Sequence, residues 1–187
     1  MTWYMPWEID FLNALQNIRN PILDKIMVFF STLGNAGIFW IVIALILLIP
    51  KKTRWTGFEC ICAMLVTFII GNLILKNVFD RTRPWVVTGF DQFPAGLKLP
   101  GDASFPSGHT MNSITASLVL LFNDKRMGIP AVIIAVLISF SRMYNYCHFP
   151  TDVIAGVVIG IVSAICMHLI FRFWRNKIQN NENKIPS

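Results

Sequence analysis

The chain has 187 residues, of which 55% are hydrophobic and 14% are charged, and its mean hydropathy is +0.57. This composition excludes an ordinary soluble domain and predicts one compact, all-α integral membrane domain. The formal net charge is +6. The basic residues form short clusters between apolar runs, as in cytoplasmic loops, so a lipid bilayer is the expected partner and nucleic acid is not.

The N-terminal region, residues 1–34, mixes apolar and polar side chains. Residues 22–33 are too few to span a bilayer comfortably. We expect two amphipathic helices in the outer interface, broken at Asn20-Pro21. The alternative is that residues 22–33 form a sixth, short span with the N-terminus inside. Aromatic anchors are expected at Trp3, Tyr4 and Trp7.

Residues 35–174 carry the apolar runs that we expect to form the membrane core. A spanning helix needs about 20 residues, and each run is bounded by charge, Pro or Gly. The sequence therefore predicts a polytopic helical bundle of five spans, at 35–50, 56–76, 106–122, 128–146 and 152–174.

The distribution of basic residues predicts the orientation of these spans. If the five spans alternate, the loops at 51–55 and 123–127 share one side with the tail after Phe171, and that side holds nine of the sixteen Lys and Arg residues. It is the expected cytoplasmic side. Residues 175–187 then form a polar cytoplasmic tail, which we expect to be disordered from Asn176 onwards.

The opposite side receives nearly all the polar residues that suggest chemistry. The long stretch 77–105 is expected to be a non-helical loop that forms a substrate rim. It meets the end of the second span and the turn at 147–151. Three motifs converge there: Lys76-x6-Arg83-Pro84, Pro106-Ser107-Gly108-His109 and Ser141-Arg142-x5-His148-x3-Asp152.

The spacing of these motifs is similar to the signature of the type 2 phosphatidic acid phosphatase superfamily, which includes lipid phosphate phosphatases, undecaprenyl diphosphate phosphatases, glucose-6-phosphatase and vanadium haloperoxidases. The match is dense over residues 76–152. The small size resembles the bacterial membrane branch. The resemblance implies a multi-pass phosphatase of the bacterial plasma membrane.

The motif residues also suit phosphoryl transfer on chemical grounds. Lys76, Arg83 and Arg142 supply cations that can stabilise the charge on a phosphoryl group in transit. Ser107 is expected to be both the N-cap of a helix and a hydroxyl donor. Gly108 allows the phosphate to approach the free amides at the helix start.

Two histidines are expected to divide the catalytic work. Asp152 lies four residues after His148 and is expected to orient its ring, so that His148 attacks phosphorus and becomes phosphorylated. His109 is expected to protonate the leaving oxygen as a general acid. Water then hydrolyses the phosphohistidine.

Other residues whose side chains could act in catalysis are assigned no catalytic role. His168 lies toward the cytoplasmic end of the last span and is expected to be structural. Arg81 is expected either to steer anionic headgroups or to be solvated. The four cysteines show no disulfide framework, and Cys147 is not expected to be a catalytic thiol.

The sequence thus predicts a hydrolase that removes the terminal phosphate of a lipid (di)phosphate at the outer leaflet. Undecaprenyl diphosphate is the first choice of substrate, with phosphatidylglycerophosphate and phosphatidic acid as alternatives. No cofactor is expected, and a metal is disfavoured because no carboxylate cluster surrounds the histidines. A lipid or ion transporter is the alternative from another class, disfavoured because the charges gather at one face.

Overall fold

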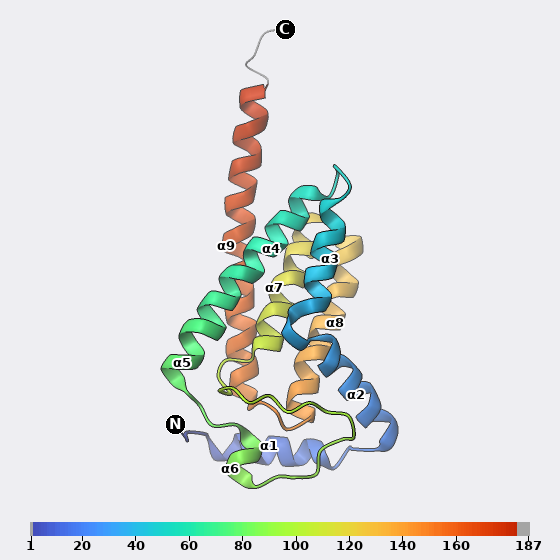
Figure 1. Ribbon diagram of the computed structural model, residues 1–187, viewed down its shortest axis with the longest axis vertical. Coiled ribbons are helices and arrows are strands. Elements are labelled where there is room, and N and C mark those ends of the chain that lie inside the picture. Colours follow the sequence, from blue (N-terminus) through green and yellow to red (C-terminus); the bar gives the residue numbers. More distant parts are fainter. Residues whose placement is uncertain (1, 183–187) are drawn as a thin grey trace.

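The computed structural model describes residues 2–182, and every regular element in that range is helical. Figure 1 shows α3, α4, α7, α8 and α9 side by side, with α1 lying across their lower end. In chain order the elements are α1 (Pro6–Gln16), α2 (Pro21–Leu33), η1 (Asn35–Gly37), α3 (Ile38–Leu48), α4 (Arg54–Phe68), η2 (Ile69–Leu75), α5 (Lys76–Phe79), α6 (Pro84–Thr88), α7 (Gly108–Asn123), α8 (Lys125–Tyr144) and α9 (Pro150–Glu182).

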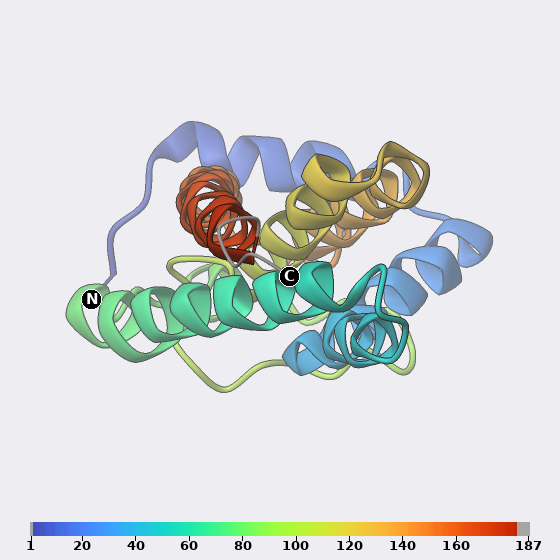
Figure 2. The same cartoon turned by 90° about the horizontal axis from the view of Figure 1, so that it is seen from above.

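Helix α7 is the central element, and it packs against α4, α8 and α9. Viewed from above, α4 runs along one side of the bundle with α7 and α9 beside it (Figure 2). A Cβ atom added at Gly160 of α9 would lie 2.9 Å from the Cβ of Ile114, so glycine lets these two helices approach closely. Trp40 of α3 donates a hydrogen bond to the Ser113 hydroxyl at 2.9 Å. These contacts fix α7 at the centre.

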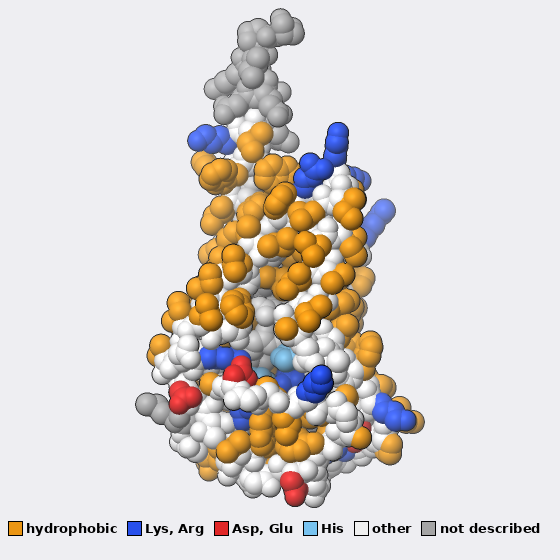
Figure 3. Space-filling model, viewed as in Figure 1, with side chains coloured by type: hydrophobic (Ala, Val, Ile, Leu, Met, Phe, Trp, Pro, Cys, Tyr) orange, Lys and Arg blue, Asp and Glu red, His pale blue; other side chains and the backbone are white. Residues whose placement is uncertain are grey.

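A belt of apolar side chains crosses the middle of the bundle on the face shown in Figure 3. Surfaces of this kind are found where a helix faces lipid. Basic side chains of the turn between α3 and α4 are exposed beyond the belt, at the upper end in Figure 3. The belt therefore identifies a membrane protein. Its members include Ile46, Leu65, Ile133 and Val162, each more than half exposed.

The predicted number of five spans is not confirmed. Among the described residues, three helical segments are long and apolar enough to cross a membrane, within Arg54–Thr88, Lys125–Tyr144 and Pro150–Ile178. Helix α7 has 16 residues, or about 24 Å at 1.5 Å per residue. It is enclosed by protein, so its length is not set by the lipid.

The fourth candidate span is a bent pair of helices. Helix α2 and the segment Asn35–Leu48 pass the same test together, with a bend of 47° between them. The bend occurs where Ala36 and Gly37 take positive φ angles of 50° and 67°, which no α-helix accommodates. The helix expected over 35–50 therefore begins only at Ile38, as α3. The interfacial placement of residues 1–34 stays a prediction.

Two further expectations on local structure were wrong. The stretch 77–105 is not wholly irregular, because Pro84 begins the short helix α6, where its fixed φ suits the first turn. The tail is not disordered over residues 176–182, because α9 continues to Glu182. The rest of the tail, 183–187, lies outside the described residues.

Candidate active site

Five of the expected site residues line one cavity of about 220 Å³ at the end of the bundle remote from the basic turn at 51–54. In Figure 3 histidine side chains are visible in a hollow just below the apolar belt, with basic and acidic side chains around it. The wall comes from α5, α7, the start of α6 and the turn before α9. The five residues are Lys76, Arg83, Gly108, His109 and His148.

The cations Lys76 and Arg83 are bridged by a carboxylate that the sequence did not single out. Asp102 forms an ion pair with the Lys76 ammonium and another, at 2.5 Å, with Nη2 of Arg83. Burial opposes ionisation of Asp102, but the two cations outweigh it and lower its pKa to about 2. The side chain of Asp102 is 53% exposed. A carboxylate thus lies between the two cations expected to bind phosphate.

His148 is enclosed, and its Nε2 atom faces Arg83. That nitrogen lies 3.2 Å from Nη1 of Arg83, which also donates to the Cys147 carbonyl at 2.9 Å. Burial, followed by the charges of Arg83 and Arg142, holds the pKa of His148 well below 6.5. The ring is therefore neutral at pH 7, and a neutral imidazole has a free lone pair for attack on phosphorus.

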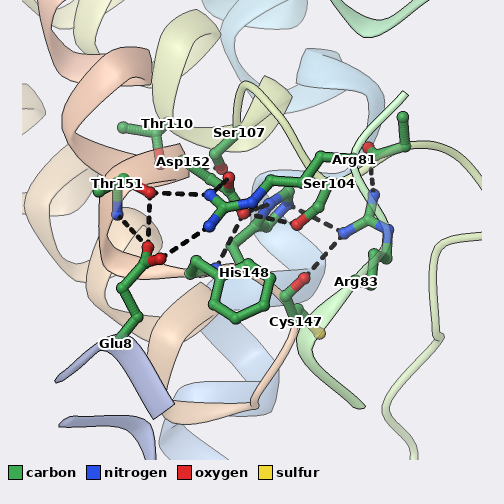
Figure 4. Close-up of polar contacts among 12 residues, drawn as sticks. Glu8, Arg81, Arg83, Ser104, Ser107, Thr110, Cys147, His148, Thr151 and Asp152 are labelled. Atoms are coloured by element: carbon green, nitrogen blue, oxygen red, sulfur yellow. Dashed lines mark hydrogen bonds and ion pairs between the residues drawn. The ribbon is translucent and has the colours of Figure 1, made fainter. Parts of the chain in front are cut away.

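Asp152 lies beside His148 but is bound mainly by other groups (Figure 4). Its Oδ2 atom is 3.5 Å from Nδ1 of His148, and this nitrogen has no hydrogen-bond partner among the described residues. The expected orienting hydrogen bond is thus not formed, although the carboxylate is adjacent. Asp152 instead accepts hydrogen bonds from the Ser104 hydroxyl at 2.5 Å and the Phe149 amide at 2.8 Å.

Arg81 connects Asp152 to the N-terminal helix. Its guanidinium pairs with Asp152 at 2.5 Å and with Glu8 of α1 at 2.8 Å. It lies between the rings of Trp3 and Phe149, with centroids 3.9 and 4.1 Å away, and it is only 1% exposed. The expectation that Arg81 is solvated or steers headgroups was therefore wrong, because the structure buries it behind Asp152.

The start of α7 lies against the cavity. Ser107 occupies the N-cap position as expected, but among the described residues its side chain makes no capping hydrogen bond and instead accepts one from the Thr110 hydroxyl at 3.0 Å. A Cβ atom on Gly108 would lie 3.0 Å from Oδ1 of Asn72. Asn72 belongs to the π-helical segment η2, a distortion frequent at functional sites.

Arg142 lies at the end of α8, next to the cavity and outside the set of residues that line it. Its Nη1 atom donates to the hydroxyl of Ser31 in α2. Its Nε and Nη2 atoms are buried without a hydrogen-bond partner within residues 2–182. Buried guanidinium N–H donors normally have an acceptor, and a bound phosphate would supply one for these two atoms of Arg142.

Sequence reasoning missed several polar residues of this site. Asp102 stands two residues before Ser104 in a loop rich in turn formers, where an acid carries no distinctive signal. Glu8 meets Arg81 across 73 positions, so no local pattern could pair them. Asn35 accepts a hydrogen bond from the His109 ring, with its Oδ1 2.9 Å from Nε2, and it was read only as the first residue of the expected span at 35–50.

These features define a helical membrane phosphatase, with cations, a neutral histidine and a second histidine around one anion-sized cavity. The PAP2 superfamily model matches residues 57–176. An undecaprenyl-diphosphatase of Sulfolobus acidocaldarius is 36% identical over 82% of this chain and 73% of that protein. Undecaprenyl-diphosphatase BcrC of Bacillus subtilis is 31% identical over 83% and 77%.

A solved structure agrees with these relatives. The transmembrane PAP2 type phosphatidylglycerolphosphate phosphatase of Bacillus subtilis superposes with a TM-score of 0.71 at 26% identity, covering 91% of this chain and 85% of that one. The chain therefore belongs to the PAP2 superfamily, and it is a membrane lipid phosphatase. The resemblance inferred from the three motifs is confirmed.

Proposed function

We propose that this phosphatase hydrolyses undecaprenyl diphosphate to undecaprenyl phosphate and inorganic phosphate. The observation that carries the mechanism is the presence of His109 and His148 in one cavity with Lys76 and Arg83. The two relatives named as undecaprenyl-diphosphatases, at 36% and 31% identity, support the choice of substrate.

An apolar groove beside the cavity supports a substrate with a long hydrocarbon tail. The groove has a volume of about 370 Å³ and lies between α3 and α4. It shares Ala36, Phe68 and Asn112 with the wall of the catalytic cavity. A lipid phosphate can thus place its headgroup among the cations and the first units of its tail against apolar side chains.

In the first step the Nε2 lone pair of His148 attacks the terminal phosphorus. The bond from phosphorus to the leaving oxygen breaks, and its electron pair goes to that oxygen, which takes a proton from His109. Lys76 and Arg83 stabilise the charge on the equatorial oxygens. Asp152, 3.5 Å from Nδ1, favours the tautomer with its proton on Nδ1, which keeps Nε2 free to attack.

In the second step water attacks the phosphohistidine. His109, now neutral, accepts a proton from that water, and the electron pair of the breaking P–N bond returns to Nε2 of His148. Inorganic phosphate leaves, and both histidines recover their starting protonation. Vanadate, which mimics five-coordinate phosphorus, is expected to compete with substrate.

Phosphate release from a panel of pure lipids in detergent tests this proposal. We expect kcat/KM to be highest for undecaprenyl diphosphate, ahead of phosphatidylglycerophosphate and phosphatidic acid. The His148→Ala variant should release no phosphate and take up no label from a substrate with a radioactive terminal phosphate. A preference for phosphatidylglycerophosphate would contradict the substrate, and covalent labelling of His148→Ala would contradict the nucleophile.

We also propose that the cavity faces the outside of the plasma membrane and that the C-terminus is cytoplasmic. The exposed basic turn at 51–54 lies at the end of the bundle remote from the cavity, which supports this orientation. A membrane-impermeant thiol reagent applied to intact cells should label a cysteine introduced at Thr88 and spare one at Asn180. The reverse pattern would invert the orientation without affecting the chemistry.

A further inference from the structure

The turn between α2 and α3 is strained at the point where it meets the cavity. Ala36 has a φ angle of 50° and Gly37 one of 67°, and both residues line the cavity together with Gly34. A residue other than glycine with positive φ is uncommon. Such strain persists where the surrounding structure requires it, and it clusters at active sites and ligand clamps.

This turn lies directly against the ring of His109. A Cβ atom added at Gly34 would be 2.8 Å from Cδ2 of His109 and 2.7 Å from Cγ2 of Ile138, so the backbone approaches the ring as closely as a glycine allows. The next residue, Asn35, has its Oδ1 atom 2.9 Å from Nε2 of His109. One segment therefore both confines the ring and binds one of its nitrogens.

The Asn35 contact fixes which nitrogen of His109 holds a proton. An amide oxygen can only accept a hydrogen bond, so Nε2 must be the donor. Asparagine in a turn usually bonds its own backbone. The side chain of Asn35 instead reaches a residue 74 positions away. A role in stabilising the turn alone therefore does not explain why the Asn35 side chain binds His109.

We propose that Asn35 is a positioning residue for the general acid. By accepting the Nε2 proton of His109, it directs the second proton, which the ring takes up when the anionic substrate binds beside it, to Nδ1, and this proton is delivered to the leaving oxygen. When the bond between phosphorus and that oxygen breaks, the Nδ1 proton moves to the oxygen. The ring is then neutral and keeps its proton on Nε2, which still donates a hydrogen bond to Asn35. This inference rests on the proposed acid role of His109.

The dependence of rate on the leaving group tests the proposal in the purified full-length protein. For aryl phosphates of rising phenol pKa, a working general acid keeps the decrease in kcat/KM shallow, because the leaving oxygen is protonated as it departs. We expect Asn35→Ala to steepen this dependence. The loss should be under about 3-fold for p-nitrophenyl phosphate and roughly 10- to 100-fold for phenyl phosphate. Asn35→Asp, which keeps an acceptor in place, should retain the shallow dependence.

The double variant Asn35→Ala/His109→Ala shows whether Asn35 acts through His109. We expect it to be no slower than His109→Ala alone, because the group that Asn35 positions is already gone. Additive losses, or an Asn35→Ala loss that is equal for all leaving groups, would overturn the proposal. A His109→Ala variant with unchanged leaving-group dependence would instead refute the acid role of His109 itself.

Two further variants separate positioning from folding. Asn77→Ala is the matched control, because Asn77 is also at the outer end but donates its amide hydrogen bond to Leu73 of the same helical segment. It should leave the leaving-group dependence unchanged. Should Asn35→Ala not fold, Asn35→Ser removes the long acceptor while keeping a small polar side chain, and it is expected to give the same steep dependence.

Discussion

Two buried charge clusters lie at opposite ends of the same bundle. The cluster at the end proposed to be cytoplasmic, called the inner cluster, consists of Glu59 of α4, Asn123 of α7, and His168 and Arg175 of α9. Glu59 pairs with His168 at 2.8 Å and with Arg175 at 2.9 Å, and it accepts a hydrogen bond from Asn123 at 3.1 Å. The outer cluster surrounds the cavity. Each cluster holds a buried carboxylate beside an arginine, at a position where apolar side chains would cost less.

The clusters differ in how completely their polar atoms are paired. Within the described residues, the buried side-chain atoms without a partner include Nε and Nη2 of Arg142, Nδ1 of His148 and Oδ1 of Asn112, and none belongs to the inner cluster. An unpaired buried group costs about 1–3 kcal/mol. The lack of unpaired buried atoms among the described residues of the inner cluster fits a structural role, and the unpaired buried atoms of the outer cluster fit a site that a ligand completes.

The comparison is tested most strongly by the two histidines. His148→Ala is expected to lower kcat by at least about 10⁴-fold, because removal of a nucleophile abolishes the covalent route. His168→Ala should keep kcat within about 2-fold and lower the melting temperature, since it removes only a hydrogen bond with Glu59. Steady-state kinetics and thermal unfolding in detergent measure both effects. A large kcat loss in His168→Ala would show that the two ends are not functionally distinct.

The arginines give the second test. Arg142→Ala should lower kcat/KM about 10²- to 10³-fold, the effect of losing a donor to the charge that develops in the transition state. Arg175→Ala should instead destabilise the fold, by about 1–3 kcal/mol, because Glu59 loses a partner while buried. Equal activity losses in the two variants would indicate that Arg142 also acts through stability.

Sequence reasoning located the outer cluster because three local spacings share one membrane face. That face is fixed by alternation of spans, so Lys76, Arg83, His109 and His148 were expected to meet, and they line one cavity. The catalytic roles of these residues remain predictions. The type of chemistry could be inferred because it depends on residue types and spacing.

Features that depend on long-range packing could not be inferred. The bend at Asn35–Gly37 takes the first three residues out of the helix expected over 35–50 and joins this helix to α2 at an angle of 47°. The carboxylate of Glu8 reads as the polar face of an interfacial helix, yet it is buried by Arg81. Asn35 of the bend contacts His109 and Glu8 contacts Arg81, and these partners lie 74 and 73 positions away in the sequence. The periodicity of the sequence indicates only which residues are apolar.

Glu8 provides the third test, because it acts on the outer cluster from a distance. Glu8→Gln weakens the anchor of Arg81 and should let Asp152 shift relative to His148. We expect kcat to fall roughly 10- to 100-fold, as for a small misplacement of a reacting group, while the inhibition constant of inorganic phosphate, a ground-state ligand, stays unchanged. A variant that lost only stability would not show this split. Asp10→Asn, at an exposed position of the same helix, is the control and should change neither constant.

The smallest effect is expected at Asp102, whose carboxylate lies between the cations that are proposed to bind phosphate. If phosphate must displace it, Asp102→Asn should lower the inhibition constant of inorganic phosphate about 2- to 5-fold, the range for a half-exposed ion pair. The lowered pKa of about 2 keeps Asp102 ionised above that pH, so the ratio of the two constants should be the same from pH 5 to pH 8. The difference would disappear only as the pH fell toward that pKa and the carboxylate became neutral.

Asp91→Asn serves as the control for Asp102, because Asp91 is an exposed residue of the same loop and should leave phosphate inhibition unchanged. If Asp102→Asn raised the inhibition constant instead, the carboxylate would be holding Lys76 and Arg83 in place for the ligand. The outer cluster would then be organised by its own ion pairs, like the inner one, and the contrast between the two ends would reduce to the unpaired atoms of Arg142 and His148.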